Sequence, residues 1–173
     1  MLDLWMPISD ISPQGKTFTF DDQEIWRQGW AEFAIPLAPG RDLAAEVTVQ
    51  PQADEGALVR GSLTGSVMIP CGRCAEPFEF AIDETFDVYE HLPDAEGDDD
   101  EPRVRVVSGQ LQLDMGAVLW EAFALALPVR PLCSESCRGV CPKCGKDLNK
   151  GDCGCVQDDG DERLAVFRNL KIK

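Results

Sequence analysis

Four closely spaced pairs of cysteines dominate this chain of 173 residues. In chain order, the first to fourth pairs are Cys71 and Cys74, Cys133 and Cys137, Cys141 and Cys144, and Cys153 and Cys155. A tetrahedral zinc ion takes its sulfur ligands at about 2.3 Å, and a two-residue spacer folds into a tight turn that presents two of them. A disulfide within such a pair would be strained, because the bridge requires a Cα–Cα distance of roughly 5 to 6 Å. The eight cysteines therefore predict two structural zinc ions, each held by four thiolates.

Two groupings of the pairs fit the spacing. In the first, the third and fourth pairs form a small zinc ribbon, and the first pair meets the second, which clamps the end of the chain to the predicted sheet. In the second, the first pair meets the third and the second pair meets the fourth. Closing the short loop between the third and fourth pairs costs little chain entropy, which favours the first grouping. The spacing alone leaves both open.

The predicted fold class is α+β, an antiparallel β-sheet core with a buried helix. A chain of this length can hold a core domain and a small metal-bound module. We therefore predict a β-rich core domain with a buried helix over residues 1–127. Residues 128–173 are predicted to form a cysteine-rich, zinc-ribbon-like module with a short C-terminal helix.

Alternating apolar and polar residues predict strands over residues 31–35, 46–50 and 77–89, and a run of β-favouring residues with glycines suited to bends or bulges predicts another over residues 57–69. The alternation is typical of an antiparallel sheet with one face in water. The first cysteine pair then lies in the turn of a hairpin between the last two strands. A metal ion bound there would fix the register of the sheet.

A helix is predicted over residues 115–127, with Asp114 as its N-cap and Pro128 and Pro131 beyond its end. Its apolar residues cover more than one face, so we expect it to be largely buried. The acidic runs at 94–101 and 158–162 predict solvated loops. A short helix is expected from residue 163 onward, with acidic residues before it and basic residues after it.

The net charge of −15 is unevenly distributed. Residues 1–127 carry 7 basic and 24 acidic residues, whereas residues 128–173 carry 9 and 7. An acidic surface repels phosphate backbones, so only the carboxyl-terminal part is suited to face RNA. Each four-thiolate zinc site also has a net charge of −2, so the basic residues near the cysteines have local charge balance as an alternative role.

Nothing in the sequence predicts catalysis. A zinc ion closed by four sulfurs has no position for water or substrate. His91 is the only histidine, and no nucleophile motif or phosphate-binding glycine loop accompanies it. The spacing from Cys137 to Cys144 resembles the iron–sulfur motif of radical enzymes that use adenosylmethionine, but only 29 residues follow it. A redox Cys-x-x-Cys would need a βαβ setting that the strands around Cys71 do not offer.

The compartment follows from the cysteines and from the start of the chain. Residues 1–7 lack the basic region and apolar run of a signal peptide, and no stretch reaches the roughly 18 apolar residues of a membrane span. Thiols remain available for metal in the reducing cytosol. The expected location is therefore cytoplasmic, with no membrane partner and no small-molecule substrate.

Several ordered segments resemble the YceD family of bacteria and plastids. They include Cys71-Gly-Arg-Cys74-Ala-Glu-Pro-Phe, the run from Trp120 to Cys133, Cys137-Arg-Gly-Val-Cys141-Pro-Lys-Cys144-Gly, Cys153-Gly-Cys155 and residues 161–167. The resemblance covers most of the chain from about residue 61 onward. It implies a small non-catalytic protein needed for the accumulation of large-subunit ribosomal RNA, and hence a role in ribosome biogenesis.

The sequence and the resemblance leave three alternative functions open. As a ribosome biogenesis factor, the chain would bind pre-ribosomal large-subunit RNA through its carboxyl-terminal module, or a basic ribosomal protein through its acidic face. As a zinc-ribbon adaptor, it would bind proteins of a transcription or regulatory complex. As a thiol redox enzyme, it would carry cysteines that titrate freely without releasing zinc.

Overall fold

The computed structural model describes residues 4–33, 35, 37–52, 56–93 and 102–155. Within these ranges the elements follow one another as β1 (Trp5–Pro7), β2 (Lys16–Phe20), α1 (Gln23–Glu32), β3 (Ala38–Pro39), β4 (Ala44–Gln52), β5 (Gly56–Pro70), β6 (Pro77–His91), β7 (Val104–Val107), β8 (Gln110–Asp114), α2 (Met115–Ala126) and the 3-10 helix η1 (Leu148–Lys150). The predicted α+β class with an antiparallel sheet is confirmed.

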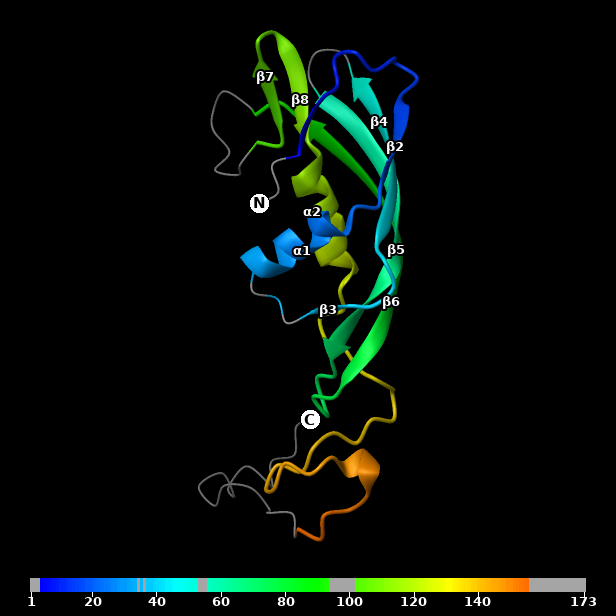
Figure 1. The fold of residues 1–173 in the computed structure, drawn as a ribbon, viewed down its shortest axis with the longest axis vertical. Coiled ribbons are helices and arrows are strands. Elements are labelled where there is room, and N and C mark those ends of the chain that lie inside the picture. Colours follow the sequence, from blue (N-terminus) through cyan, green and yellow to red (C-terminus); the bar gives the residue numbers. More distant parts are fainter. Residues whose placement is uncertain (1–3, 34, 36, 53–55, 94–101, 156–173) are drawn as a thin grey trace, which may run out of the picture.

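The main sheet is built around a long hairpin. β5 and β6 pair along their whole length, from Gly56 opposite His91 to Pro70 opposite Pro77. β4 and then β2 continue the sheet on the other side of β5, and β3 joins that same side near the closed end of the hairpin. Both long strands curve along the molecule (Figure 1). The strands predicted over 46–50, 57–69 and 77–89 are confirmed as β4, β5 and β6.

A smaller sheet of three strands has the order β1-β8-β7. Its central strand β8 leads directly into α2, and the Asp114 carboxylate accepts a hydrogen bond from the N–H of Ala117 at 3.1 Å. This N-cap satisfies an amide that the first helical turn leaves without a partner. The predicted cap of Asp114 is therefore confirmed, and the helix ends at Ala126, one residue earlier than expected.

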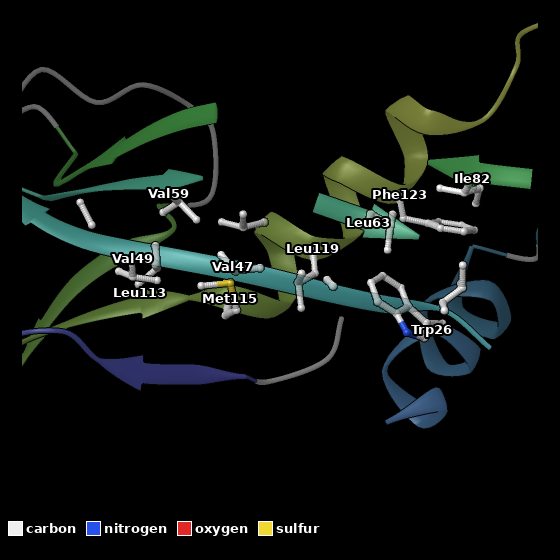
Figure 2. Close-up of a cluster of buried hydrophobic side chains, with 14 of the residues drawn as sticks. Trp26, Val47, Val49, Val59, Leu63, Ile82, Leu113, Met115, Leu119 and Phe123 are labelled. Carbon is white, nitrogen blue, oxygen red and sulfur yellow. The ribbon is translucent and has the colours of Figure 1, made fainter. Parts of the chain in front are cut away.

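The core lies between the inner face of the main sheet and the two helices. Trp26 of α1 and Phe123 of α2 are fully buried there, with ring centroids 5.9 Å apart. Figure 2 shows the Phe123 ring next to Leu63 and Ile82 and the Trp26 ring near Leu119, while Met115 and Leu113 lie next to Val47 and Val49 of β4 farther along the core. Burying each large apolar side chain stabilises the fold by about 1.5 to 3 kcal/mol. The core therefore holds α2 against the sheet.

Two predictions, a strand over residues 31–35 and a largely buried helix over residues 115–127, need correction. Residues 31 and 32 belong to α1, not to a strand, because Asp22 caps a helix whose residues Trp26 and Trp30 both face the core. The second half of α2 is more exposed than predicted, since Leu125 keeps 77% of its surface in solvent. The acidic runs at 94–101 and 158–162 and the short C-terminal helix lie outside the described residues.

The chain leaves α2 and runs to the closed end of the β5–β6 hairpin, where residues 128–155 lie beyond the sheet (Figure 1). We call these residues the cysteine segment. The division into domains at residue 128 stays a prediction. Among the described residues, neither helix has the length and apolar character needed to span a bilayer.

Candidate metal centre

The turn between β5 and β6 carries the first cysteine pair. The N–H of Cys71 donates to the carbonyl of Glu76 at 2.9 Å, and the N–H of Ala75 donates to the carbonyl of Cys71 at 2.9 Å. Ala75 takes a left-handed conformation, with φ of 58°. These bonds wrap residues 71–76 into a compact turn that buries both cysteines. Their sulfurs therefore face away from water.

The first and second pairs meet at this turn. The Sγ atoms of Cys71 and Cys137 are 3.8 Å apart, as are those of Cys74 and Cys133. All four sulfurs lie within 4.8 Å of one another. A tetrahedron with zinc–sulfur distances of about 2.3 Å has edges of about 3.8 Å, whereas a disulfide needs about 2.05 Å. We call these four residues the hairpin cluster; their spacing suits a tetrahedral metal ion.

The third pair repeats the same turn. The N–H of Cys141 donates to the carbonyl of Lys146 at 2.9 Å, and the N–H of Gly145 donates to the carbonyl of Cys141 at 2.8 Å. Gly145 stands at the position of Ala75 and has a φ of 72°, which glycine adopts without strain. The backbone of this turn therefore matches that of the hairpin turn bond for bond.

The fourth pair completes a second group of sulfurs. The sulfurs of Cys141, Cys144, Cys153 and Cys155 lie within 4.8 Å of one another. We call these four residues the ribbon cluster. Cys144 and Cys155 are exposed, so this cluster is more open to solvent than the hairpin cluster. The structure thus brings the pairs together in the first of the two groupings, and each group of four can hold a metal ion.

Arg73 links the hairpin turn to the cysteine segment. Its Nη1 donates to the carbonyl oxygens of Glu135 at 3.0 Å and Cys137 at 2.9 Å. Its own carbonyl accepts a hydrogen bond from the N–H of Val140 at 3.1 Å. Gly139 fits beside this carbonyl only because it lacks a Cβ, which would lie 2.9 Å from the oxygen. The Arg73 side chain and backbone therefore hold the two pairs of the hairpin cluster together.

Asn149 connects η1 to the hairpin cluster, a role that was not predicted from the sequence. Its Nδ2 donates to the sulfur of Cys137 at 3.4 Å, and its Oδ1 accepts from the N–H of Arg138 at 2.8 Å. Asp147 caps η1 and orients this amide through a bond of 2.7 Å. The Asp-x-Asn spacing, which is typical of a capped turn, was the signal that could have drawn attention to it.

The thiols of each cluster differ in acidity. Backbone N–H groups, first that of Cys133 and then that of Cys74, lower the pKa of the Cys71 thiol to about 6. The neighbouring Cys137 sulfur and then burial raise the pKa of Cys133 to about 12. One sulfur thus ionises readily, while the next must carry its charge beside an existing thiolate. A divalent cation removes that cost by binding all four thiolates.

The ribbon cluster has the same pattern. Backbone N–H groups, first that of Cys144 and then that of Lys143, lower the pKa of the Cys141 thiol to about 6. The neighbouring sulfurs, first that of Cys144, raise the pKa of Cys155 to about 12. In both clusters one thiol therefore ionises readily, and a second ionises with difficulty because a neighbouring sulfur is already charged.

Basic side chains of the cysteine segment are engaged within the protein. Arg138 forms an ion pair with Asp152, and Lys146 donates to the carbonyl of Asp152 at 2.9 Å. Lys150 donates to Glu76 at 2.6 Å, which ties η1 to the hairpin turn. These contacts favour local charge balance over RNA contact as the role of these three side chains.

Comparison with known sequences adds a family relationship. The family model described as "Large ribosomal RNA subunit accumulation protein YceD" matches residues 59–171. An uncharacterized protein of Mycobacterium tuberculosis is 33% identical over 118 residues, which cover 66% of this chain and 55% of that protein. The large ribosomal RNA subunit accumulation protein YCED homolog 1, chloroplastic, of Arabidopsis thaliana is 28% identical over 60 residues, which are 35% of this chain and 19% of that protein.

A third relative, an uncharacterized protein of Mycobacterium leprae, is 26% identical over 97 residues, which cover 54% of this chain and 44% of that protein. The matched part of the chain spans about half the length of the mycobacterial relatives. No solved structure matches. The family match runs from β5 through the cysteine segment, so it contains both clusters.

Proposed function

The chain belongs to the YceD family, and from this membership we propose that it is a non-catalytic ribosome biogenesis factor. In this role it supports the accumulation or processing of large-subunit ribosomal RNA in the cytoplasm. The observation that carries the proposal is the family match over residues 59–171. That range contains α2, all eight cysteines and the β5–β6 hairpin, of which only the first residues of β5 lie outside it.

We propose zinc as the metal of both clusters. Four sulfur donors, two 3.8 Å edges and a pair of equivalent Cys-x-x-Cys turns are typical of a structural zinc site. In the hairpin cluster, Cys71 and Cys74 from the turn and Cys133 and Cys137 from the segment would bind one ion. Zinc supplies a cross-link at such a site and no open coordination position, which agrees with a non-catalytic role.

In this proposal the two clusters have a shared structural task. The hairpin cluster fastens the cysteine segment to the closed end of the sheet, with help from Arg73. The ribbon cluster fixes the ends of the loop that contains η1. Asn149 and Lys150 of η1 donate hydrogen bonds to Cys137 and Glu76, respectively. A partner would therefore meet one rigid surface made of sheet and segment.

Charge favours a basic ribosomal protein as the direct partner over RNA. The chain has a net charge of −15, and each zinc–tetrathiolate site would add a charge of about −2. Three basic residues of the cysteine segment, Arg138, Lys146 and Lys150, are engaged within the protein. An acidic protein of this kind attracts basic chains and repels phosphate backbones.

The test compares ribosomal RNA in cells with and without the protein. Loss of the whole chain should lower large-subunit RNA relative to small-subunit RNA, and the wild-type chain should restore it. Deletion of residues 128–173 should fail to restore it. An unchanged ratio after loss of the whole chain would refute the proposal. Recovery of the protein with a transcription complex, and not with ribosomal precursors, would support a zinc-ribbon adaptor instead.

A further inference from the structure

The outer edge of β6 has no partner strand among the described residues. β6 pairs with β5 along all of its 15 residues. An edge strand presents a row of backbone N–H and C=O groups that can pair with another chain. The mean strand in globular proteins has about 5 to 6 residues, so this open row is long.

Side chains along β6 alternate in character. Those directed to the core are apolar and half-buried, namely Phe78, Phe80, Phe86 and Val88, with Ile82 fully buried between them. Glu79, Asp83 and Asp87 occupy the opposite, solvent-facing side and are exposed. Glu84 lies in the core-directed series opposite Leu63, yet it is also exposed. The open edge therefore offers an apolar row on one face and an acidic row on the other.

Two carboxylates at the middle of this edge are free to meet a cation. Asp87 is paired with Arg60 at 2.7 Å, and Glu79 lies 3.5 Å from Arg41. Asp83 and Glu84, by contrast, have no ion pair among the described residues. Carboxylates without a basic partner in the described part of the chain therefore lie between Glu79 and Asp87, the two that have one.

The other edge of the sheet provides a contrast within the same molecule. β2 is only 5 residues long and contains Lys16 but no acidic residue. If acidic residues merely accompanied every edge of this acidic protein, β2 would be expected to have them too. Length and charge both distinguish β6 as the edge suited to a basic segment.

We propose that the open edge of β6 binds a basic, extended segment of a ribosomal protein as an added antiparallel or parallel strand. Lysine or arginine at every second position would lie beside Asp83 and Asp87, at the separation of roughly 5 Å that cross-strand neighbours have. Apolar residues at the intervening positions would cover Phe80 and Phe86. This inference names the partner class of the proposed function and rests on it for the source of the segment.

A second copy of the chain fits this edge poorly. Two β6 strands side by side would place acidic rows next to each other, and like charges at neighbouring strand positions are destabilising. The acidic row thus selects against self-pairing and for a cationic partner. Backbone pairing supplies affinity in such strand addition, while alternate side chains supply specificity.

Binding is tested with the full chain and a synthetic ten-residue peptide of alternating lysine and valine. Fluorescence anisotropy gives its affinity, and two analogues carry N-methyl groups on alternate amides, one analogue for each edge of the strand. All three peptides have the same charge. Methylation of the amides that would pair with β6 should weaken binding at least about tenfold, because several hydrogen bonds are lost; methylation of the other set should have little effect. Equal binding of all three peptides would overturn the inference.

The site is located with matched variants and hydrogen exchange. The double variant Asp83→Asn with Glu84→Gln should weaken binding by about fivefold to tenfold. The control, Asp42→Asn with Glu46→Gln, removes the same charge from exposed positions away from this edge and should bind normally. The peptide should protect alternate amides within residues 79–88 and none in β2. Protection of β2, or equal loss in both double variants, would overturn the proposal.

Two further outcomes separate this inference from the proposed function. If the peptide fails to bind while loss of the chain still lowers large-subunit RNA, the edge inference alone is wrong. If the peptide binds at β6 while the RNA ratio is unchanged, strand addition is supported and the proposed function is wrong. A self-associated form in solution that protects residues 79–88 without peptide would overturn the inference in favour of a second copy.

Discussion

Asn149 should control how tightly the hairpin cluster binds the proposed zinc ion, although Asn149 is not among the four sulfur donors. Its Nδ2 donates to the Cys137 sulfur at 3.4 Å, while its Oδ1 accepts from the N–H of Arg138 at 2.8 Å. Replacement with aspartate keeps the size and the acceptor oxygen. It also exchanges the donor for a negative charge beside a thiolate. The variant Asn149→Asp therefore reverses the contacts with Cys137 and Asp147 and preserves the one with Arg138.

The expected magnitude follows from the bond that is lost. A hydrogen bond to a charged group contributes roughly 1.5 to 3 kcal/mol, and each 1.4 kcal/mol corresponds to about a tenfold change in affinity. Because an N–H···S bond lies at the weak end of this range, Asn149→Ala should weaken zinc binding about tenfold. Asn149→Asp should weaken it about 100-fold, since repulsion adds to the loss. Groups that orient metal ligands typically have effects of this size.

The assay is competition between the zinc-loaded protein and a coloured chelator, with the released zinc counted per chain. Wild-type protein should release two ions, and only one of the two steps should shift in the Asn149 variants. Asp152→Asn is the matched control, because it removes only the exposed ion pair with Arg138 and should change affinity less than about fivefold. If Asn149→Asp retained zinc as tightly as Asp152→Asn, the assigned role of the amide would be refuted.

Three other results are expected. Cys74→Ser should lower the zinc content by one ion per chain and make residues 128–140 accessible to protease, whereas the control Ser134→Ala should change neither. An unchanged number of zinc ions per chain in Cys74→Ser would count against the hairpin cluster as a metal site. Lowering the pH should release zinc, because protons compete with the metal for the thiolates. Cys155, whose pKa is raised to about 12, takes up its proton first in the metal-free protein as the pH falls. Retention of both ions at about pH 4 would contradict this prediction. Phe123→Ala should lower the free energy of unfolding by about 3 to 5 kcal/mol in urea denaturation, because Phe123 is fully buried among three tryptophans, whereas Phe123→Leu should cost much less.

Much of the fold was predictable because local patterns and the final structure agree. The period-two alternation over residues 77–89 corresponds to β6, whose core-directed side chains are more buried than those on its opposite face, and the run of β-favouring residues over 57–69 corresponds to β5. Asp114 before an apolar run gave the start of α2. The spacing of the cysteine pairs favoured the grouping that the structure has, because the loop between the third and fourth pairs is short, but it left a second grouping open.

Other features depend on contacts that sequence patterns do not reveal. α1 was missed because its core face is made by two tryptophans and a glycine, and Gly29 is required where the helix backbone meets the ring of Trp120. Asn149 was missed because a single polar residue gives no periodic signal. The open edge of β6 was equally invisible, since strand order depends on the whole sheet and not on the strand itself.

The position of the hairpin cluster also determines how the molecule would respond to mechanical force. With zinc bound, tension on the chain after Cys155 would pass through the ribbon cluster to the hairpin cluster and Arg73, and would enter the sheet at the closed end of β5 and β6. That direction runs along the strands, so the nine residue pairs between β4 and β5 would resist together in shear. Single-molecule pulling should then show a higher rupture force with zinc than after chelation, and equal forces would contradict this load path.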